Sequence, residues 1–379
     1  MTLANPPVPD LLYSELEEEL RETVRDVLKS KAEWADVLAR TESTATVDTE
    51  LWTTLAADVG LAGLVVAEEH GGAGASWREV AVVLEELGRA VAPVPFLGAA
   101  VTTPALLTAL HLHDELAVTV SGETVLTVVV PADRLPWTDA EFTGVTADSD
   151  GRLTGTVRSV SDAGNADTLL VPVGNTLYAV DRPAAQIAPV VSLDMTRQLS
   201  DIALDGAAGR RLGAHEVGAA VRSALTVSSA LLASEQLGLA EQCLEMTVDY
   251  LKDRRQFGRV LGSYQSVKHR LADLWVDITQ ARAVARYAAA CAALGSPDLP
   301  MASSLAHVVC SATAVRAAEE CIQLHGGIGF TWEHPAHLYL KRAKSAQLLF
   351  GSPAAHRRRI GELAALDAAS AQPLAGVSA

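Results

Sequence analysis

The sequence predicts a mainly α-helical protein with a β middle domain, because the spacing of its apolar residues changes twice along 379 residues. Toward both ends of the chain, apolar side chains recur every three or four residues, as on the buried face of a helix. Between these regions, short runs rich in β-branched residues are separated by Gly, Asn and Pro, as in strands and turns. We therefore expect an N-terminal helical domain (1–115), an antiparallel β barrel or sandwich (116–212) and a C-terminal four-helix bundle (213–379).

The N-terminal domain begins with an amphipathic helix. Four apolar residues follow one another at intervals of four: Leu16, Leu20, Val24 and Leu28. Further helices are expected over 51–59, where Gly60 ends the pattern, and over 77–87. The segment 64–74 reads as an extended run that closes in a glycine-rich turn.

Four apolar runs in the middle domain predict strands, at 118–120, 124–130, 169–173 and 177–180. Asp-Gly and Gly-Asn pairs between them are typical of tight turns. No long helix separates the runs, so the strands should be antiparallel. This pattern excludes a Rossmann domain as a nucleotide-binding unit.

The C-terminal third returns to helical spacing. Helices are expected over 215–257, 264–294, 301–324 and 335–349, and again from residue 354. Long helices joined by short links favour an antiparallel bundle.

The composition excludes several classes of function. A formal net charge of -16 argues against nucleic acid as a partner. No apolar run has the length of a membrane span and the N-terminus lacks the pattern of a signal peptide, so we expect a cytoplasmic protein without a membrane partner. The four cysteines have no metal-ligand spacing and are expected to be buried free thiols. Basic residues are concentrated at 252–259, 341–344 and 357–359, the last two being expected mainly as solvated helix charge.

Two segments point to an anionic ligand. One is the glycine cluster at the end of Cys321–Phe330, whose backbone can approach a ligand closely and present free N–H groups. The other is Asp253–Arg259, in which Arg254 offers a planar fork for phosphate beside the aromatic ring of Phe257. Each is expected at the end of a helical segment. Together they indicate a dinucleotide site built from helices.

These motifs, in this order of regions, resemble the acyl-CoA dehydrogenase family along most of the chain. Tyr250–Gly258 resembles the Tyr-x-x-x-Arg-x-x-Phe-Gly pattern of the family, and Gln323–Gly329 resembles its Gln-x-x-Gly-Gly-x-Gly pattern. Residues 68–74 resemble its N-terminal Glu-Glu-x-Gly-Gly-x-Gly segment, with Ala67 in place of proline. The resemblance implies FAD as cofactor, bound through Arg254, Gln256, Phe257, Gln265, Gln323, Leu324, His325, Gly326 and Gly327. We expect the two segments to converge on one diphosphate from two protomers.

The resemblance also implies a reaction. It is the α,β-desaturation of an acyl-CoA thioester with hydride transfer to FAD, in fatty acid or steroid catabolism, while a carboxylate removes the α-proton. An electron-transfer flavoprotein would be the acceptor. The protein would be a dimer or tetramer, either of one chain or with a second acyl-CoA dehydrogenase subunit. No metal is implied, and the sequence does not identify the acyl group.

The chain departs from the family at the catalytic base. Of the two positions where members carry the catalytic Glu, one holds Phe350 and the other Ser228. Glu235 lies two helical turns after Ser228 on the same face, and is either a replacement base or a buried structural residue. The flavin-binding strand of the family is also missing, with 130–137 in its place.

We therefore expect an acyl-CoA dehydrogenase-type oxidoreductase subunit that does not itself carry the usual base. The alternatives are a self-sufficient enzyme that uses Glu235, and a non-catalytic partner subunit or a CoA- or flavin-binding scaffold in a heteromeric complex.

Overall fold

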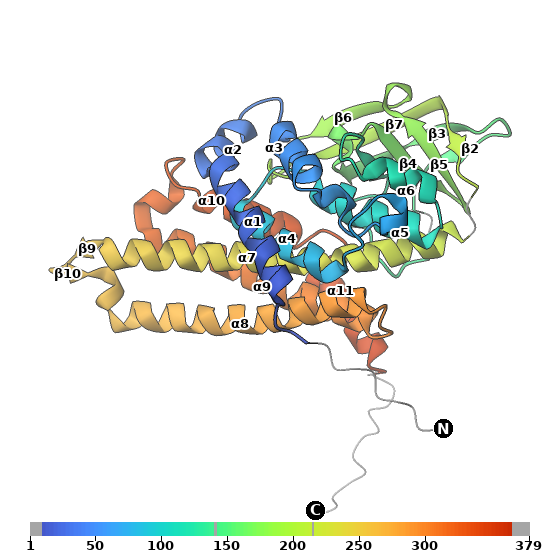
Figure 1. Ribbon diagram of the computed structural model, residues 1–379. Helices are drawn as coiled ribbons and strands as arrows, with labels where there is room; N and C mark the ends of the chain where they lie inside the picture. Colours follow the sequence, from blue (N-terminus) through green and yellow to red (C-terminus); the bar gives the residue numbers. More distant parts are fainter. Residues whose placement is uncertain (1–9, 140–141, 214–215, 366–379) are drawn as a thin grey trace, which may run out of the picture.

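The computed structural model describes residues 10–139, 142–213 and 216–365, and it confirms a mainly helical chain with a β middle domain (Figure 1). The first helices pack on one side of the long C-terminal helices, and the strands lie beyond one end of this contact. The four cysteines are free and buried, as expected.

The N-terminal helices are α1 (Glu15–Lys31), α2 (Trp34–Thr41), α3 (Thr49–Thr53), α4 (Trp77–Ala90), α5 (Thr103–Ala109) and α6 (His113–Thr119). Ser14 and Ser76 begin α1 and α4, each in a reciprocal capping box with the glutamate three residues later. These boxes satisfy backbone N–H groups that would otherwise lack partners.

Two predictions in this region were wrong. Residues 64–74 are not extended: 3₁₀ turns form at Leu61–Gly63 and Glu68–His70. Residues 118–120 end helix α6 instead of forming a strand, and Val120 packs against Gly63. The β-branched residues at 118–120 favour a strand locally, but this tertiary contact outweighs so short a preference.

Within residues 126–211, as far as the structure describes them, the middle domain contains two four-stranded sheets. One has the order β1 (Leu126–Val128), β4 (Thr168–Val173), β5 (Thr176–Asp181), β8 (Arg210–Arg211). The other has the order β2 (Thr146–Ala147), β3 (Arg152–Ser161), β7 (Leu199–Ala208), β6 (Gln186–Val190). Apolar residues of both sheets share one core, including Leu153, Leu169, Val180 and Ile202, as in a sandwich. The pairing within these sheets is antiparallel except between β1 and β4, which are parallel, so the expectation of antiparallel strands is wrong for this pair.

The C-terminal helices are α7 (Val217–Asp253), α8 (Gln265–Ala293), α9 (Leu299–His325), α10 (Ala336–Ala346) and α11 (Pro353–Leu363). Helix α7 ends four residues before the predicted boundary. The next residues form a hairpin of β9 (Arg255–Gln256) and β10 (Arg259–Val260), whose two central residues, Phe257 and Gly258, both have positive φ. A two-residue hairpin of this kind requires such backbone angles.

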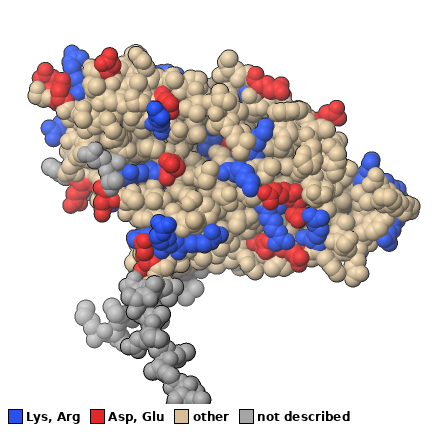
Figure 2. Space-filling model, turned by 180° about the vertical axis from the view of Figure 1, so that it is seen from behind, with Lys and Arg blue, Asp and Glu red and all other residues tan. Residues whose placement is uncertain are grey.

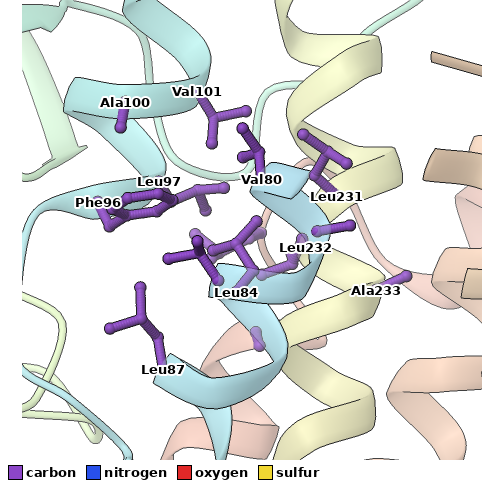
Figure 3. Packing of buried hydrophobic residues seen from close by; sticks show 14 of the residues in the cluster. Val80, Leu84, Leu87, Phe96, Leu97, Ala100, Val101, Leu231, Leu232 and Ala233 are labelled. Carbon is purple, nitrogen blue, oxygen red and sulfur yellow. The ribbon is translucent and has the colours of Figure 1, made fainter. Parts of the chain in front are cut away.

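Helix α7 is the centre of the core. By length and composition it could cross a membrane, but 72% of its most apolar window is buried within the protein. Figure 3 shows Val80 and Leu84 of α4 packed beside Leu231 and Leu232 of α7. The two backbones touch where the helices cross: a Cβ on Gly238 would lie 1.8 Å from the Glu85 carbonyl oxygen, and one on Gly88 would lie 2.0 Å from the Glu235 carbonyl oxygen.

Candidate functional site

The two anion-binding motifs lie together at one end of the helical bundle. Tyr250 occupies the last turn of α7, and its ring stacks on that of His325, the last residue of α9, with 4.4 Å between ring centroids. This contact brings the β9–β10 hairpin and the glycine turn to the same end of a single chain. The expectation that the two segments need two protomers to meet is therefore corrected: one protomer presents both.

The glycine turn has two exposed positions that are open to a ligand, Gly326 and Gly327. Gly326 has φ 64° and ψ -137°, angles that favour glycine, and a Cβ on Gly329 would lie 2.6 Å from the Ile322 carbonyl oxygen. These two glycines are thus required by the turn itself. Gly327 has no positive φ; like Gly326 it is exposed, and a Cβ at either position would have no atom within 4 Å.

The other predicted cofactor residues occupy the same end. Arg254, Gln256, Gln265 and Gln323 are exposed, Leu324 is half-buried, and His325 is buried beneath the turn. Phe257 is 87% exposed although its φ of 54° is uncommon for a bulky residue. Figure 2 shows basic side chains at the bundle end that carries the hairpin.

Exposed aromatic residues surround this basic end. Phe330 and Trp332 follow the glycine turn and are, like Phe257, large exposed hydrophobic residues. Lys341 lies over the Trp332 ring, with its Nζ 4.5 Å from the ring centroid. Guanidinium groups, aromatic faces and free amides are the groups that bind a dinucleotide diphosphate and stack on its base.

Members of the family carry the catalytic base at one of two positions. Here these positions hold Ser228 and Phe350, which are both buried and carry no charge. Ser228 Oγ lies 2.8 Å from Thr102 Oγ1 and also donates to the Ala224 carbonyl oxygen. Phe350 is 7% exposed, has φ 58°, and its N–H donates to the Ala132 carbonyl oxygen at 2.8 Å. The cavity between these elements measures only about 30 Å³. It has room for about one water molecule, and not for a thioester.

Asp162 is a carboxylate in the wall of this cavity that the sequence analysis did not identify. Its Oδ2 accepts a hydrogen bond from the Gly98 N–H at 3.1 Å. Burial raises its pKa, and the positive charges of Arg197 and Arg342 oppose that effect. A lone Asp between β3 and β4 has no sequence signal that would separate it from a turn residue.

Glu235 lies between two arginines and is 2% exposed. Its Oε2 accepts a hydrogen bond from Arg197 Nη2, and its Oε1 accepts one from Arg342 Nε at 3.0 Å. Burial alone would raise the pKa of Glu235, but the two guanidinium charges outweigh burial and lower it. An ionised carboxylate paired on both oxygens favours the structural alternative for this residue over the base.

Arg342 was expected to be solvated, and this prediction was wrong. Its side chain is 3% exposed, and besides Glu235 it donates to Thr196 Oγ1 at 3.0 Å and to the Ala92 carbonyl oxygen at 3.3 Å. The network therefore joins α7 and α10 to the β domain and to the segment after α4. Because the partners of Arg342 come from segments far apart in the sequence, the local pattern around Arg342 could not predict its burial.

Two of the larger cavities among the described residues adjoin the segment 130–137. One, of about 500 Å³, lies between the β domain and α10 and is lined by residues that include Pro131, Asp133, Arg158, Leu193, Lys344 and Leu348. Its volume is in the range of small-molecule sites. The other, of about 230 Å³, includes Trp137, Arg222, Ser303 and Arg359. The segment 130–137, which lacks the flavin-binding pattern of the family, thus contributes to both walls.

Comparison with known proteins gives consistent matches. The model of the acyl-CoA dehydrogenase N-terminal domain matches residues 14–113, and that of the C-terminal domain matches residues 218–364. Acyl-CoA dehydrogenase IpdE2 of Mycolicibacterium smegmatis is 38% identical over 92% of this chain and 98% of its own. Among solved structures, the Tcur3481-Tcur3483 steroid ACAD is 32% identical, with a TM-score of 0.81 over 94% of this chain and 99% of that one. The ChsE4-ChsE5 complex of Mycobacterium tuberculosis is 27% identical, with a TM-score of 0.82 over 95% of this chain and 100% of that one.

Proposed function

Because the chain belongs to the acyl-CoA dehydrogenase family, we propose that it is the subunit of a heteromeric member that completes the FAD site of its partner and leaves proton abstraction to that partner. The family assignment makes it an FAD-dependent oxidoreductase subunit that acts in an oligomer on an acyl-CoA thioester. FAD, when bound, accepts the hydride.

The observation that carries this proposal is the contrast between two places in one chain. At the bundle end, Arg254, Phe257 and Gly327 are exposed in an arrangement suited to a diphosphate. At the position of the base, Phe350 lines a cavity of only about 30 Å³. The chain therefore retains residues that can bind the FAD diphosphate in a partner's site, but it lacks a catalytic carboxylate and the space for a substrate at its own base position.

The residues of the bundle end fit the diphosphate chemically. The Arg254 guanidinium can donate two parallel hydrogen bonds to phosphate oxygens, which a lysine cannot do. The backbone of the glycine turn adds N–H donors that need no side chain. Phe257 has a strained backbone and almost no contact within its own chain, which suits a ring that packs on a ligand or a second subunit.

Co-purification tests the proposal. The chain alone is expected to lack flavin colour, and mixing it with the acyl-CoA dehydrogenase subunit of a neighbouring gene should yield a complex that holds FAD and oxidises acyl-CoA. Arg254→Met should abolish FAD retention in the complex, whereas Lys252→Met, two residues earlier and also exposed, should not. Flavin absorbance and turnover by the lone chain would refute the proposal.

Gly327→Ala is a more selective probe of the same site. We expect it to fold normally, because the added methyl group meets no atom within 4 Å, but to weaken FAD binding about tenfold or more by keeping the cofactor from the backbone. Gly361→Ala is the control, since a Cβ there also meets nothing. FAD titration of the complex by fluorescence measures both variants. Equal affinity in the two would show that no ligand approaches Gly327.

The similarity to the Tcur3481-Tcur3483 steroid ACAD leads us to propose a steroid-derived, polycyclic acyl group as the substrate. We place the complex in the cytoplasm with an electron-transfer flavoprotein as acceptor. Initial rates of the reconstituted complex should be higher with a CoA thioester of a sterol side chain or ring fragment than with a straight-chain thioester. The reverse order would exclude this substrate class and leave the role of the subunit intact.

A further inference from the structure

Trp332 is an indole beside the glycine turn and is 58% exposed. Two residues later, the His334 ring packs against that of His325, with 4.1 Å between the ring centroids. His325 ends α9 directly before the glycine turn. The segment that follows the turn therefore folds back over the end of α9, and Trp332 stays close to Gly327.

Hydrogen bonds fix the backbone that carries Trp332. The Thr331 N–H donates to the Ile328 carbonyl oxygen at 3.0 Å, and the Thr331 hydroxyl donates to the same oxygen at 2.8 Å. The Glu333 N–H in turn donates to Thr331 Oγ1 at 3.3 Å. Residues 328–333 thus form a hydrogen-bonded turn, in which a threonine hydroxyl binds the local backbone, rather than a free loop.

Two residues of α10 hold the indole ring. Lys341 Nζ lies 4.5 Å from the ring centroid, and the His337 ring meets the indole edge-on, with 4.6 Å between centroids. The two residues are one helical turn apart and so lie on one face of α10. Neither ring nitrogen of His337 has a hydrogen-bond partner within the described chain, so His337 acts by packing. A ring that is already held in place loses little conformational entropy when a ligand stacks on it.

The exposed phenylalanines of the bundle end are less well prepared for a ligand. Phe257 and Phe330 are 87% and 79% exposed. Within the part of the chain that the structure describes, neither ring makes an aromatic or a cation–π contact. A ligand would have to order these rings, at a cost in entropy. Trp332 also offers a larger π face and is therefore the ring best suited to stack on a base.

Lys341 adds a positive charge beside the indole. The nearby Lys344 pairs with Glu319 at 3.0 Å, whereas Lys341 has no carboxylate partner among the described residues. Nucleotide-binding surfaces combine aromatic rings, on which bases stack, with cations that attract the phosphates. Lys341 and Trp332 provide both groups next to the amides of the glycine turn.

We propose that Trp332 is the platform on which the adenine base of FAD stacks, and that Lys341 and His337 hold the indole in position for it. The inference rests on the proposed role of the bundle end in a partner's FAD site, and it adds recognition of the base to binding of the diphosphate. Arg254 and the glycine turn bind phosphate from any source, whereas an aromatic platform selects ligands that carry a flat ring. The adenine half of the cofactor thus gains a contact that inorganic diphosphate cannot make.

Competition against FAD tests the platform in the complex of the chain with its partner subunit. Cofactor-free complex is titrated with FAD, followed by flavin fluorescence, in the presence of ADP or of inorganic diphosphate. Trp332→Ala is expected to weaken the binding of FAD and of ADP about tenfold, because the stacking of one base is lost, and to leave the affinity for diphosphate unchanged. Trp332→Phe should retain most of the affinity for ADP. Trp275→Ala, which removes an indole that is 57% exposed on α8, should change neither affinity.

The two competitors separate stacking from structural damage and from the proposed function itself. Equal losses of ADP and diphosphate affinity in Trp332→Ala, or no loss of either, would overturn the platform. If Arg254→Met nevertheless abolished FAD retention, the proposed function would stand without the platform. A complex of unaltered chains that bound neither FAD nor diphosphate would overturn both.

Discussion

Replacing Glu235 by glutamine is expected to lower the free energy of unfolding by about 3–5 kcal/mol. Glutamine keeps the shape of the side chain but removes the charge between Arg197 and Arg342, so two buried guanidinium groups lose their shared counterion. Breaking a buried ion pair from one side costs more than the pair itself contributes, because an uncompensated charge remains in the interior. Urea denaturation followed by circular dichroism measures the loss.

Glu245→Gln is the matched control for this prediction. Glu245 also pairs with an arginine, Arg89, but its side chain is 56% exposed. Solvent screens such a pair, so the substitution should change the stability by less than about 1 kcal/mol. If Glu235→Gln instead left the stability unchanged and abolished turnover of the reconstituted complex, Glu235 would be the base and its structural role would be refuted.

The pH dependence of stability follows from the same pair. Because the folded pKa of Glu235 lies below its unfolded value of roughly 4.3, its contribution is present above that value and is lost as the pH falls through the folded pKa. Asp162 acts in the opposite direction, since its folded pKa is raised. The Glu235→Gln variant should therefore lose less stability than the unaltered chain when the pH is lowered from about 5 to 3.

Gly238→Ala is expected to destabilise the fold by about 3 kcal/mol or more, although alanine is the better helix former. The new methyl group would lie 1.8 Å from a backbone oxygen of α4, so the helices must separate along their whole contact. Thermal unfolding and the yield of folded protein measure the effect.

Gly218→Ala, in the same helix, is the control for Gly238. A Cβ there lies 3.5 Å from the nearest atom, an ordinary contact, so the substitution should be neutral or stabilising by about 0.5–1 kcal/mol. Similar losses of stability in both variants would show that α4 and α7 do not meet as closely as described.

The sequence predicted the elements that periodicity specifies and missed those that distant contacts decide. The long helices repeat an apolar pattern over many residues, and this pattern predicted them, as the short apolar runs predicted β1, β4 and β5. The two longest strands, β3 and β7, were not predicted. The hairpin at Arg255–Val260 was missed because Phe257, which has no local preference for positive φ, occupies a turn position that usually holds Asn or Gly.

In the candidate site, too, the local motifs were predicted, whereas the contacts between distant segments were not. The motifs around Arg254 and Gly327 were readable as motifs, but their meeting in one chain depends on the stacking of Tyr250 on His325, 75 positions apart in the printed sequence. The burial of Arg342 and the cavity beside Asp162 likewise depend on segments from different parts of the fold. A local sequence pattern does not determine which distant segments come into contact in the folded chain.

The small cavity at Phe350 sets a condition on any attempt to convert this subunit into an independent catalyst. A glutamate engineered at that position would enter a space whose wall already contains the carboxylate of Asp162, and the mutual repulsion of two acids in a water-poor recess would favour the protonated, non-basic form. Restoring a working base would thus require neutralising Asp162 and enlarging the recess in the same design.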